Sequence, residues 1–190
     1  MVGTVTVGPF GSSVAAIASE RIIVHGGSKQ GFSGMLGSAA SPGDLMKFAA
    51  DGAESDLYTF DAAVYGEVPV AILDFDPEQS ATIDTAMADG DSAFFHVYEE
   101  GLIWRANYKD NVALIPGDKC TLSGTGGKLD KMIYATLTGT TPYGFSSSHI
   151  AKATTSYATP CYVVAVSWSS VVSVSSRSSA VQIWAQARSW

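Results

Sequence analysis

The chain has 190 residues, of which 46% are hydrophobic and 15% are charged, and its net charge is −7 at pH 7. This length and apolar content are enough for a buried core, and they exclude disorder throughout. With only 11 Lys and Arg residues, the chain lacks the basic clusters that bind nucleic acid or an anionic membrane, so we expect neither as a partner.

Residues 1–40 are predicted to form an N-terminal arm with one short strand. They are rich in Gly, Ser and Ala, and especially in Gly from 26 to 37, a composition that costs much conformational entropy to order and buries little surface. The short strand is expected at Ile22, Ile23 and Val24, where the apolar residues gather. We see neither a secretory signal nor a run of about 18 apolar residues for a membrane helix, so synthesis in a cytoplasm is expected.

A Gly-Asp turn occurs three times, each time before a short apolar run: Gly43-Asp44, Gly90-Asp91 and Gly117-Asp118. Glycine accepts positive φ and the aspartate side chain bonds to nearby backbone, so the pair closes a tight turn. We therefore predict that each copy starts a β-strand.

Between residues 42 and 106, runs rich in Val, Phe, Tyr and Ile alternate with Asp, Gly and Glu clusters. Strands are expected at residues 45–48, 57–60, 68–75, 94–98 and 102–106, with Glu99-Glu100-Gly101 as a hairpin turn between the last two. Short strands at this spacing are typical of a small β-barrel or β-sandwich, so the predicted class is all-β.

A second series of strands follows residue 116. Strands are expected at 120–122 and 132–137, with a turn at 124–128 between them, and again in CYVVAVSW and AVQIWAQ. Residues 138–160, rich in Thr, Ser and Tyr, are predicted to be a long loop. The order of PGD-strand, apolar strand and closing strand thus occurs twice within the predicted domain of residues 41–190, which indicates an internal repeat.

Acidic and glycine-rich motifs give no complete ligand site. Asp74, Asp76 and Glu78 alternate like the start of a calcium loop, but Gln79 and Thr85 replace its glycine and its bidentate glutamate. SGTGGKL likewise lacks the first glycine and the final Ser or Thr of a phosphate-binding loop. Solvated turns are the favoured interpretation of both, and we expect no metal and no cofactor.

Histidine and cysteine residues are few and far apart. His25, His96 and His149 lack zinc-ligand spacing, and His96 is expected to be packed or at an interface. Cys120 and Cys161 are expected to be buried free thiols. A Ser-His-Asp triad needs no proximity in the sequence and stays open, but we expect no enzymatic activity.

Aromatic residues are the candidates for intermolecular contacts, because they bury large areas at low entropic cost. Trp104 and Trp168 lie in apolar strands and are expected to be core. The interface candidates are Trp184, Trp190, Tyr143, Phe145, Tyr157, Phe10 and Phe32.

In PGDLMKF, VPVAILDF, GDSAFFHV, PGDKCTL and CYVVAVSW, over roughly residues 41–185, the chain resembles the capsid decoration, or cement, proteins of tailed bacteriophages and related viruses. The resemblance implies a β-rich virion protein that binds the exterior of an assembled capsid and ties capsomers together. It also implies two partners, the shell of major capsid protein and further copies of the chain in a homotrimer.

Two other functions fit the same sequence. One is a different virion component, such as a tail, collar or head-spike protein, which would have the same composition. The other is a carbohydrate- or receptor-binding β-module, which the Tyr and Trp content favours. An enzyme ranks third, because no catalytic motif is complete.

Overall fold

The computed structural model describes residues 22–26, 31–50, 58–74, 85–132, 163–176 and 178–188. All regular structure in these residues is β, which confirms the all-β class. The strands are β1 (Ile23–His25), β2 (Gly31–Leu36), β3 (Leu45–Phe48), β4 (Thr59–Ala62), β5 (Ala71–Leu73), β6 (Ser92–Val97), β7 (Ile103–Tyr108), β8 (Lys119–Leu122), β9 (Leu129–Lys131), β10 (Ala165–Ser167) and β11 (Val181–Ala187). Within these ranges no helix is long and apolar enough to cross a membrane.

Five strands form a closed barrel in the order β2-β4-β3-β5-β6. Its interior is filled by large apolar side chains, among them Leu36, Met46, Phe60, Leu73 and Phe95. β2 and β4 run parallel, and the other pairs in this first barrel are antiparallel.

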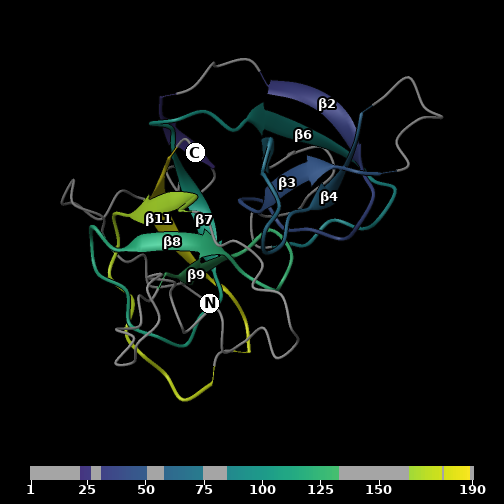
Figure 1. Ribbon diagram of the computed structural model, residues 1–190. Coiled ribbons are helices and arrows are strands. Elements are labelled where there is room, and N and C mark those ends of the chain that lie inside the picture. The colour runs from purple at the N-terminus through teal and green to yellow at the C-terminus, as the bar shows by residue number, and fades with distance from the viewer. Residues whose placement is uncertain are drawn as a thin grey trace, which may run out of the picture.

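The second sheet has the order β1-β7-β11-β10-β8-β9, and an additional pairing joins β9 to β7. That pairing, of Tyr108 with Leu129, closes β7 to β11 into a second ring of five strands, called the second barrel below. β1 lies outside the ring and pairs with the beginning of β7. In Figure 1 the labelled strands of the two barrels form two neighbouring groups.

The two barrels have the same topology. In each, the first strand runs parallel to the third, β2 to β4 and β7 to β9. In each, the second strand pairs antiparallel with the third and the fourth, and the fifth strand pairs antiparallel with the fourth and the first. The predicted internal repeat is therefore confirmed, and it is a duplicated five-stranded barrel.

The pairing register fixes which residues are equivalent. Phe32 pairs with Phe95 as Trp104 pairs with Ala185, and Phe48 pairs with Phe60 as Leu122 pairs with Leu129. Followed around both rings, the register gives these equivalent pairs: Phe32 and Trp104, Ser33 and Arg105, Met35 and Asn107, Asp44 and Asp118, Phe48 and Leu122, Tyr58 and Gly127, Thr59 and Lys128.

All three Gly-Asp turns precede strands, as predicted. The glycines have φ of 93° at Gly43, 84° at Gly90 and 94° at Gly117. Each aspartate carboxylate accepts a hydrogen bond from the backbone N–H three residues earlier, at 2.9, 2.7 and 2.8 Å. β3, β6 and β8 begin directly after these turns.

The predicted hairpin at Glu99-Glu100-Gly101 is wrong. The residues do form a turn, in which Leu102 N–H donates to the carbonyl of Glu99 and Gly101 has φ of 85°. However, β6 belongs to the first barrel and β7 to the second. The turn therefore connects the two barrels, a choice of partners that a local sequence pattern does not encode.

Residues 31–40, which were predicted to belong to an N-terminal arm, are part of the first barrel, while residues 1–21 and 27–30 of that predicted arm lie outside the described residues. The expected short strand is present as β1, but residues 31–36 form β2 of the first barrel, and Leu36 and Ala40 are core residues. The glycines that indicated a loop are required by packing, because a Cβ on Gly34 would lie 2.7 Å from the Tyr58 carbonyl oxygen.

Strand boundaries also differ from the prediction. The strand expected at 68–75 is reduced to β5, the one at 57–60 begins at Thr59, and β9 precedes the segment 132–137. Residues 133–137 and the predicted loop at 138–160 lie outside the described residues.

Candidate functional site

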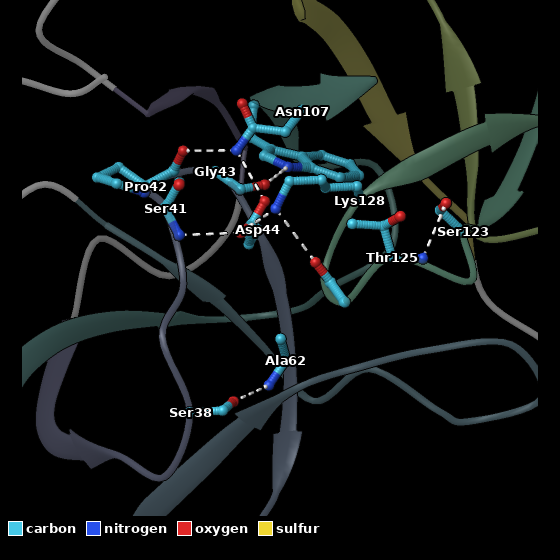
Figure 2. A network of polar contacts seen from close by, with 12 residues as sticks. Ser38, Ser41, Pro42, Gly43, Asp44, Ala62, Asn107, Ser123, Thr125 and Lys128 are labelled. Atoms are coloured by element: carbon cyan, nitrogen blue, oxygen red, sulfur yellow. Dashed lines mark hydrogen bonds and ion pairs between the residues drawn. The ribbon is translucent and has the colours of Figure 1, made fainter. Parts of the chain in front are cut away.

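The two barrels meet at the first Gly-Asp turn, where Asp44 is completely buried. Its carboxylate accepts hydrogen bonds from the side-chain amide of Asn107 at 2.7 Å and from the ammonium of Lys128 at 3.0 Å, both in the second barrel (Figure 2). The Asn107 amide also donates to the carbonyl of Pro42 at 3.0 Å. A charged network thus joins the barrels around a fully buried carboxylate.

Burial raises the pKa of Asp44 above its ordinary value of 3.8, and Lys128, the backbone N–H of Ser41 and Asn107 offset only part of this rise. The buried carboxylate therefore depends on its hydrogen-bond donors, because an uncompensated buried charge is costly.

Close backbone contacts and aromatic groups complete this junction. A Cβ on Gly43 would lie 2.2 Å from the Arg105 carbonyl oxygen, and a Cβ on Gly127 would lie 2.5 Å from the Cβ of Asp44. Trp104, fully buried as expected, donates its indole N–H to the carbonyl of Gly43 at 3.1 Å. The junction is therefore closely packed and specific in its pairing.

Apolar packing continues across the junction. Leu45, Ala63 and Ile72 of the first barrel belong to the same hydrophobic cluster as the core of the second barrel. Because their neighbours Met46 and Leu73 face the first barrel's interior, β5 and the first half of β3 are buried on both faces.

A cluster of aromatic rings extends from the core of the first barrel to its surface. Phe60 contacts Phe95 with 4.5 Å between ring centroids and Phe48 at 5.1 Å, and Phe48 contacts Tyr58 at 6.0 Å. Phe48 and Tyr58 are 56% and 66% exposed. Rigid aromatics that reach the surface in this way are typical of protein-binding surfaces.

The structure describes two of the predicted interface residues. Phe32 is half-buried and contacts Phe60 and Phe95 in the aromatic cluster. Trp184 is half-buried on β11, with the guanidinium of Arg105 5.8 Å from its ring centroid. The others, Phe10, Tyr143, Phe145, Tyr157 and Trp190, lie outside the described residues.

Sequence reasoning missed Phe48 and Tyr58. Phe48 ends a strand whose other apolar residues are buried, so its sequence context gives no sign of exposure. A comparison of the two repeats could have indicated these residues, because their equivalents are Leu122 and Gly127. That alignment, however, requires the strand register.

His96 is buried, as expected for a packed residue. Its Nε2 lies 2.6 Å from an Asp74 carboxylate oxygen, and its ring stands edge-on to Phe94. Its Nδ1 is buried and has no hydrogen-bond partner within the described part of the chain. Within the described residues no serine hydroxyl is hydrogen-bonded to this ring, so no Ser-His-Asp triad forms around His96 there.

The glycine-rich turn at 123–128 does not form a phosphate site. Lys128 is bound to Asp44, and the depression beside the turn is lined by Asp110 and Asp130 as well as by Lys109, whose ammonium donates to the carbonyl of Ser178. The two carboxylates outnumber the one cation there and disfavour phosphate. In the described ranges no three His, Cys, Asp or Glu side chains form a metal-binding group. Asp76 and Glu78, part of the proposed calcium motif, lie outside those ranges, as does Cys161.

Cys120 is a buried free thiol, as predicted. Burial raises its pKa to about 12, and nearby Asp118 and Asp130 add to this rise. At neutral pH the group is therefore a neutral thiol that packs in the core.

No protein-family model matches the chain, and no curated protein matches it. Among solved structures it is similar to the N base of head fiber gp8.5 in bacteriophage phi29, with a TM-score of 0.46 and 11% sequence identity. The similarity covers 84% of this chain and 93% of the phi29 chain. It is too low to assign a family.

Proposed function

We propose that this protein is a virion structural protein that binds the outer surface of an assembled capsid and stabilises it. The observation that carries the proposal is the exposure of large apolar side chains at two separate places. Phe48 and Tyr58 lie on the first barrel, and Ile115, Val172 and Val174 lie near the second PGD turn and the bridge of Leu114 with Val171.

Exposed apolar surface of this kind indicates a protein that functions within an assembly. The motifs shared with capsid decoration proteins give the class of assembly, and neither the Asp74–His96 pair nor the glycine-rich turn offers reactive groups to a substrate. The phi29 protein with a similar structure is a head fiber, but the similarity is too low to support this assignment.

The proposal includes a homotrimer on the capsid exterior, made after synthesis in a host cytoplasm. Several linked contacts with a shell raise affinity without any new contact of the single subunit. A protein that joins neighbouring capsomers in this way stabilises the shell against internal pressure and requires no cofactor.

The test is to mix the purified protein with capsid shells that lack it. We expect saturable binding at many symmetry-related sites and a higher temperature of shell disruption. Binding at a single vertex would favour a collar or tail protein, and binding of the isolated protein to glycans would favour a receptor-binding module. Absence of shell binding would refute the decoration role.

The variant Trp190→Ala examines the predicted shell contact. Loss of an aromatic hot spot weakens binding by about tenfold or more, so the half-saturation concentration for shells should rise by that factor. The neighbouring change Ser189→Ala is the matched control and should leave binding unchanged. Equal binding of both variants would exclude Trp190 from the contact.

A further inference from the structure

The junction inside the chain covers two different surfaces, one from each barrel. The first barrel contributes its PGD turn, in which Pro42, Gly43 and Asp44 are all buried. The second barrel contributes the region of β7 and of the β8–β9 turn, where Trp104, Asn107, Leu122 and Gly127 are buried. Because these are different parts of the same repeated unit, the contact is head-to-tail rather than symmetric.

The first barrel exposes its own copy of the surface that the second barrel buries. The residues equivalent to Trp104, Asn107, Leu122 and Gly127 are Phe32, Met35, Phe48 and Tyr58. Phe32 and Met35 are half-buried, and Phe48 and Tyr58 are exposed. Four buried positions of the second barrel thus correspond to two exposed and two half-buried apolar side chains on the first.

The second barrel exposes its own copy of the turn that the first barrel buries. Pro116 and Gly117 are exposed, and Ile115 beside them is 59% exposed. A Cβ on Gly117 would have no atom within 4 Å, whereas a Cβ on Gly43 would lie 2.2 Å from the Arg105 carbonyl oxygen. The backbone shapes of the two turns are nevertheless alike, with φ of 94° and 93°.

We propose that a second copy of this chain occupies the exposed surface: the turn Ile115-Pro116-Gly117-Asp118 of one copy docks on the Phe32, Met35, Phe48 and Tyr58 surface of the next. The internal junction is the physical precedent, because the same kind of turn already binds the equivalent surface there. Each copy keeps one exposed turn, on its second barrel, and one exposed surface, on its first barrel. The contact can therefore be repeated from copy to copy.

The charges agree with this docking. Asp44 requires Lys128 of the other barrel, and the residue equivalent to Lys128 on the exposed surface is Thr59. Asp118, however, is already paired with Lys131 of its own barrel at 2.6 Å. It can therefore approach an apolar surface without leaving an uncompensated carboxylate.

Three positions make the two contacts different. Tyr58 stands where Gly127 approaches Asp44 closely, so the contact between copies must be wider there and must use the tyrosine ring. Phe32 and Met35 also replace the hydrogen-bonding Trp104 and Asn107, which makes this contact more apolar than the internal one.

Repetition of a head-to-tail contact gives a closed ring if the rotation between copies closes, and a filament if it does not. The inference deepens the proposed function by naming how copies join, but it does not require a capsid. It is tested in solution without shells, so its failure leaves the shell-binding test independent.

The test uses the full chain and three matched variants that replace an exposed apolar residue with lysine. Phe48→Lys disables the aromatic surface, Ile115→Lys disables the turn, and Val68→Lys, at a 51% exposed site on neither surface, is the control. Sedimentation velocity and light scattering give the mass of each, and circular dichroism checks folding.

We expect the wild type and Val68→Lys to associate as concentration rises, and Phe48→Lys and Ile115→Lys to remain monomeric. An equimolar mixture of these two variants should form 1:1 dimers and nothing larger, since one functional turn and one functional surface remain. If either variant fails to fold, Tyr58→Ser replaces Phe48→Lys, or Pro116→Ser replaces Ile115→Lys.

Three results would overturn the proposal. They are a wild type that stays monomeric at all accessible concentrations, variants that associate like the wild type, and a mixture that forms no dimer. Recovery of full-size assemblies in the mixture would indicate a symmetric contact elsewhere and would equally refute head-to-tail docking.

Discussion

Gly43 and Gly117 occupy equivalent turns with nearly equal φ, but they face different surroundings. A side chain at either position requires left-handed backbone, which costs about 1–2 kcal/mol for an L-residue. Only at Gly43 would the new Cβ also collide with the backbone of the other barrel. The two glycines thus separate the cost of the turn from the cost of the junction.

We predict that Gly43→Ala lowers the free energy of unfolding by about 1–3 kcal/mol more than Gly117→Ala does, the usual cost of overpacking. Urea denaturation of both variants measures the difference. Equal losses would mean that the junction adjusts to the methyl group, and that the two glycines are required for their backbone angle alone.

Lys128 compensates a fully buried carboxylate, so its removal should be costly. In Lys128→Met the Asp44 charge is left buried, and we expect a loss of about 3 kcal/mol or more at neutral pH. The matched control is Lys131→Met, whose partner Asp118 is partly exposed, and its loss should be roughly 1 kcal/mol.

The pH dependence of Lys128→Met identifies the carboxylate concerned. Burial already holds the pKa of Asp44 above its unfolded value of 3.8, and loss of Lys128 raises it further. The folded state then binds the proton more tightly, so the stability of the variant should increase as pH falls through the folded pKa. Denaturant unfolding at neutral and acidic pH measures the stability that the variant loses relative to the wild type. We expect this loss to be smaller in acid, and a loss that does not change with pH would contradict the role of Asp44.

At the scale of the elements, the segment after β6 holds the barrels together. Tyr98 directly follows β6. Its single hydroxyl proton is shared between the carbonyls of Val164 and Arg188 in the second barrel, and its oxygen accepts a hydrogen bond from the Arg188 N–H. Burial raises the pKa of Tyr98, so the group is a neutral donor at physiological pH.

Tyr98→Phe should destabilise the protein by about 1 kcal/mol, the value of one hydrogen bond, and should speed hydrogen exchange of the Arg188 amide. The control is Tyr108→Phe, whose hydroxyl donates to Val112 within the second barrel. It should cost a similar amount without changing exchange at Arg188. A change in exchange of equal size in both variants would argue against Tyr98 as a link between barrels.

The elements also show where local sequence is sufficient. The Gly-Asp turns and the strands that follow were predictable, because turn geometry depends on neighbouring residues alone. β2 was not, because Gly31 and Gly34 resemble loop residues. A Cβ on Gly31 would lie 1.9 Å from the ring of Phe94, and that requirement arises from a strand far away in the sequence.

For the whole molecule, the shared hydrophobic cluster predicts one cooperative unfolding transition. Leu45, Ala63 and Ile72 of the first barrel pack into the second barrel's core, so neither barrel keeps its buried surface when the other unfolds. Trp104, Trp168, Trp184 and Trp190 all lie after residue 100, and tryptophan fluorescence therefore reports mainly the second barrel.

We expect the fluorescence and circular dichroism midpoints of thermal unfolding to coincide. The Gly43→Ala variant is the control. Its weakened junction should separate the fluorescence midpoint from the circular dichroism midpoint, while both barrels still fold. Separate midpoints in the wild type would show that the barrels unfold independently.

The sequence by itself determined the all-β class, the three turns and the order of the repeated strands, because these depend on local backbone preferences and on apolar patterning. Only the tertiary structure decided that Glu99-Glu100-Gly101 joins two barrels and that Phe48 and Tyr58 are exposed while their equivalents Leu122 and Gly127 are buried. The physical reason is that strand pairing and burial depend on which distant segments meet, and the two barrels, which share one topology, are covered by different neighbours.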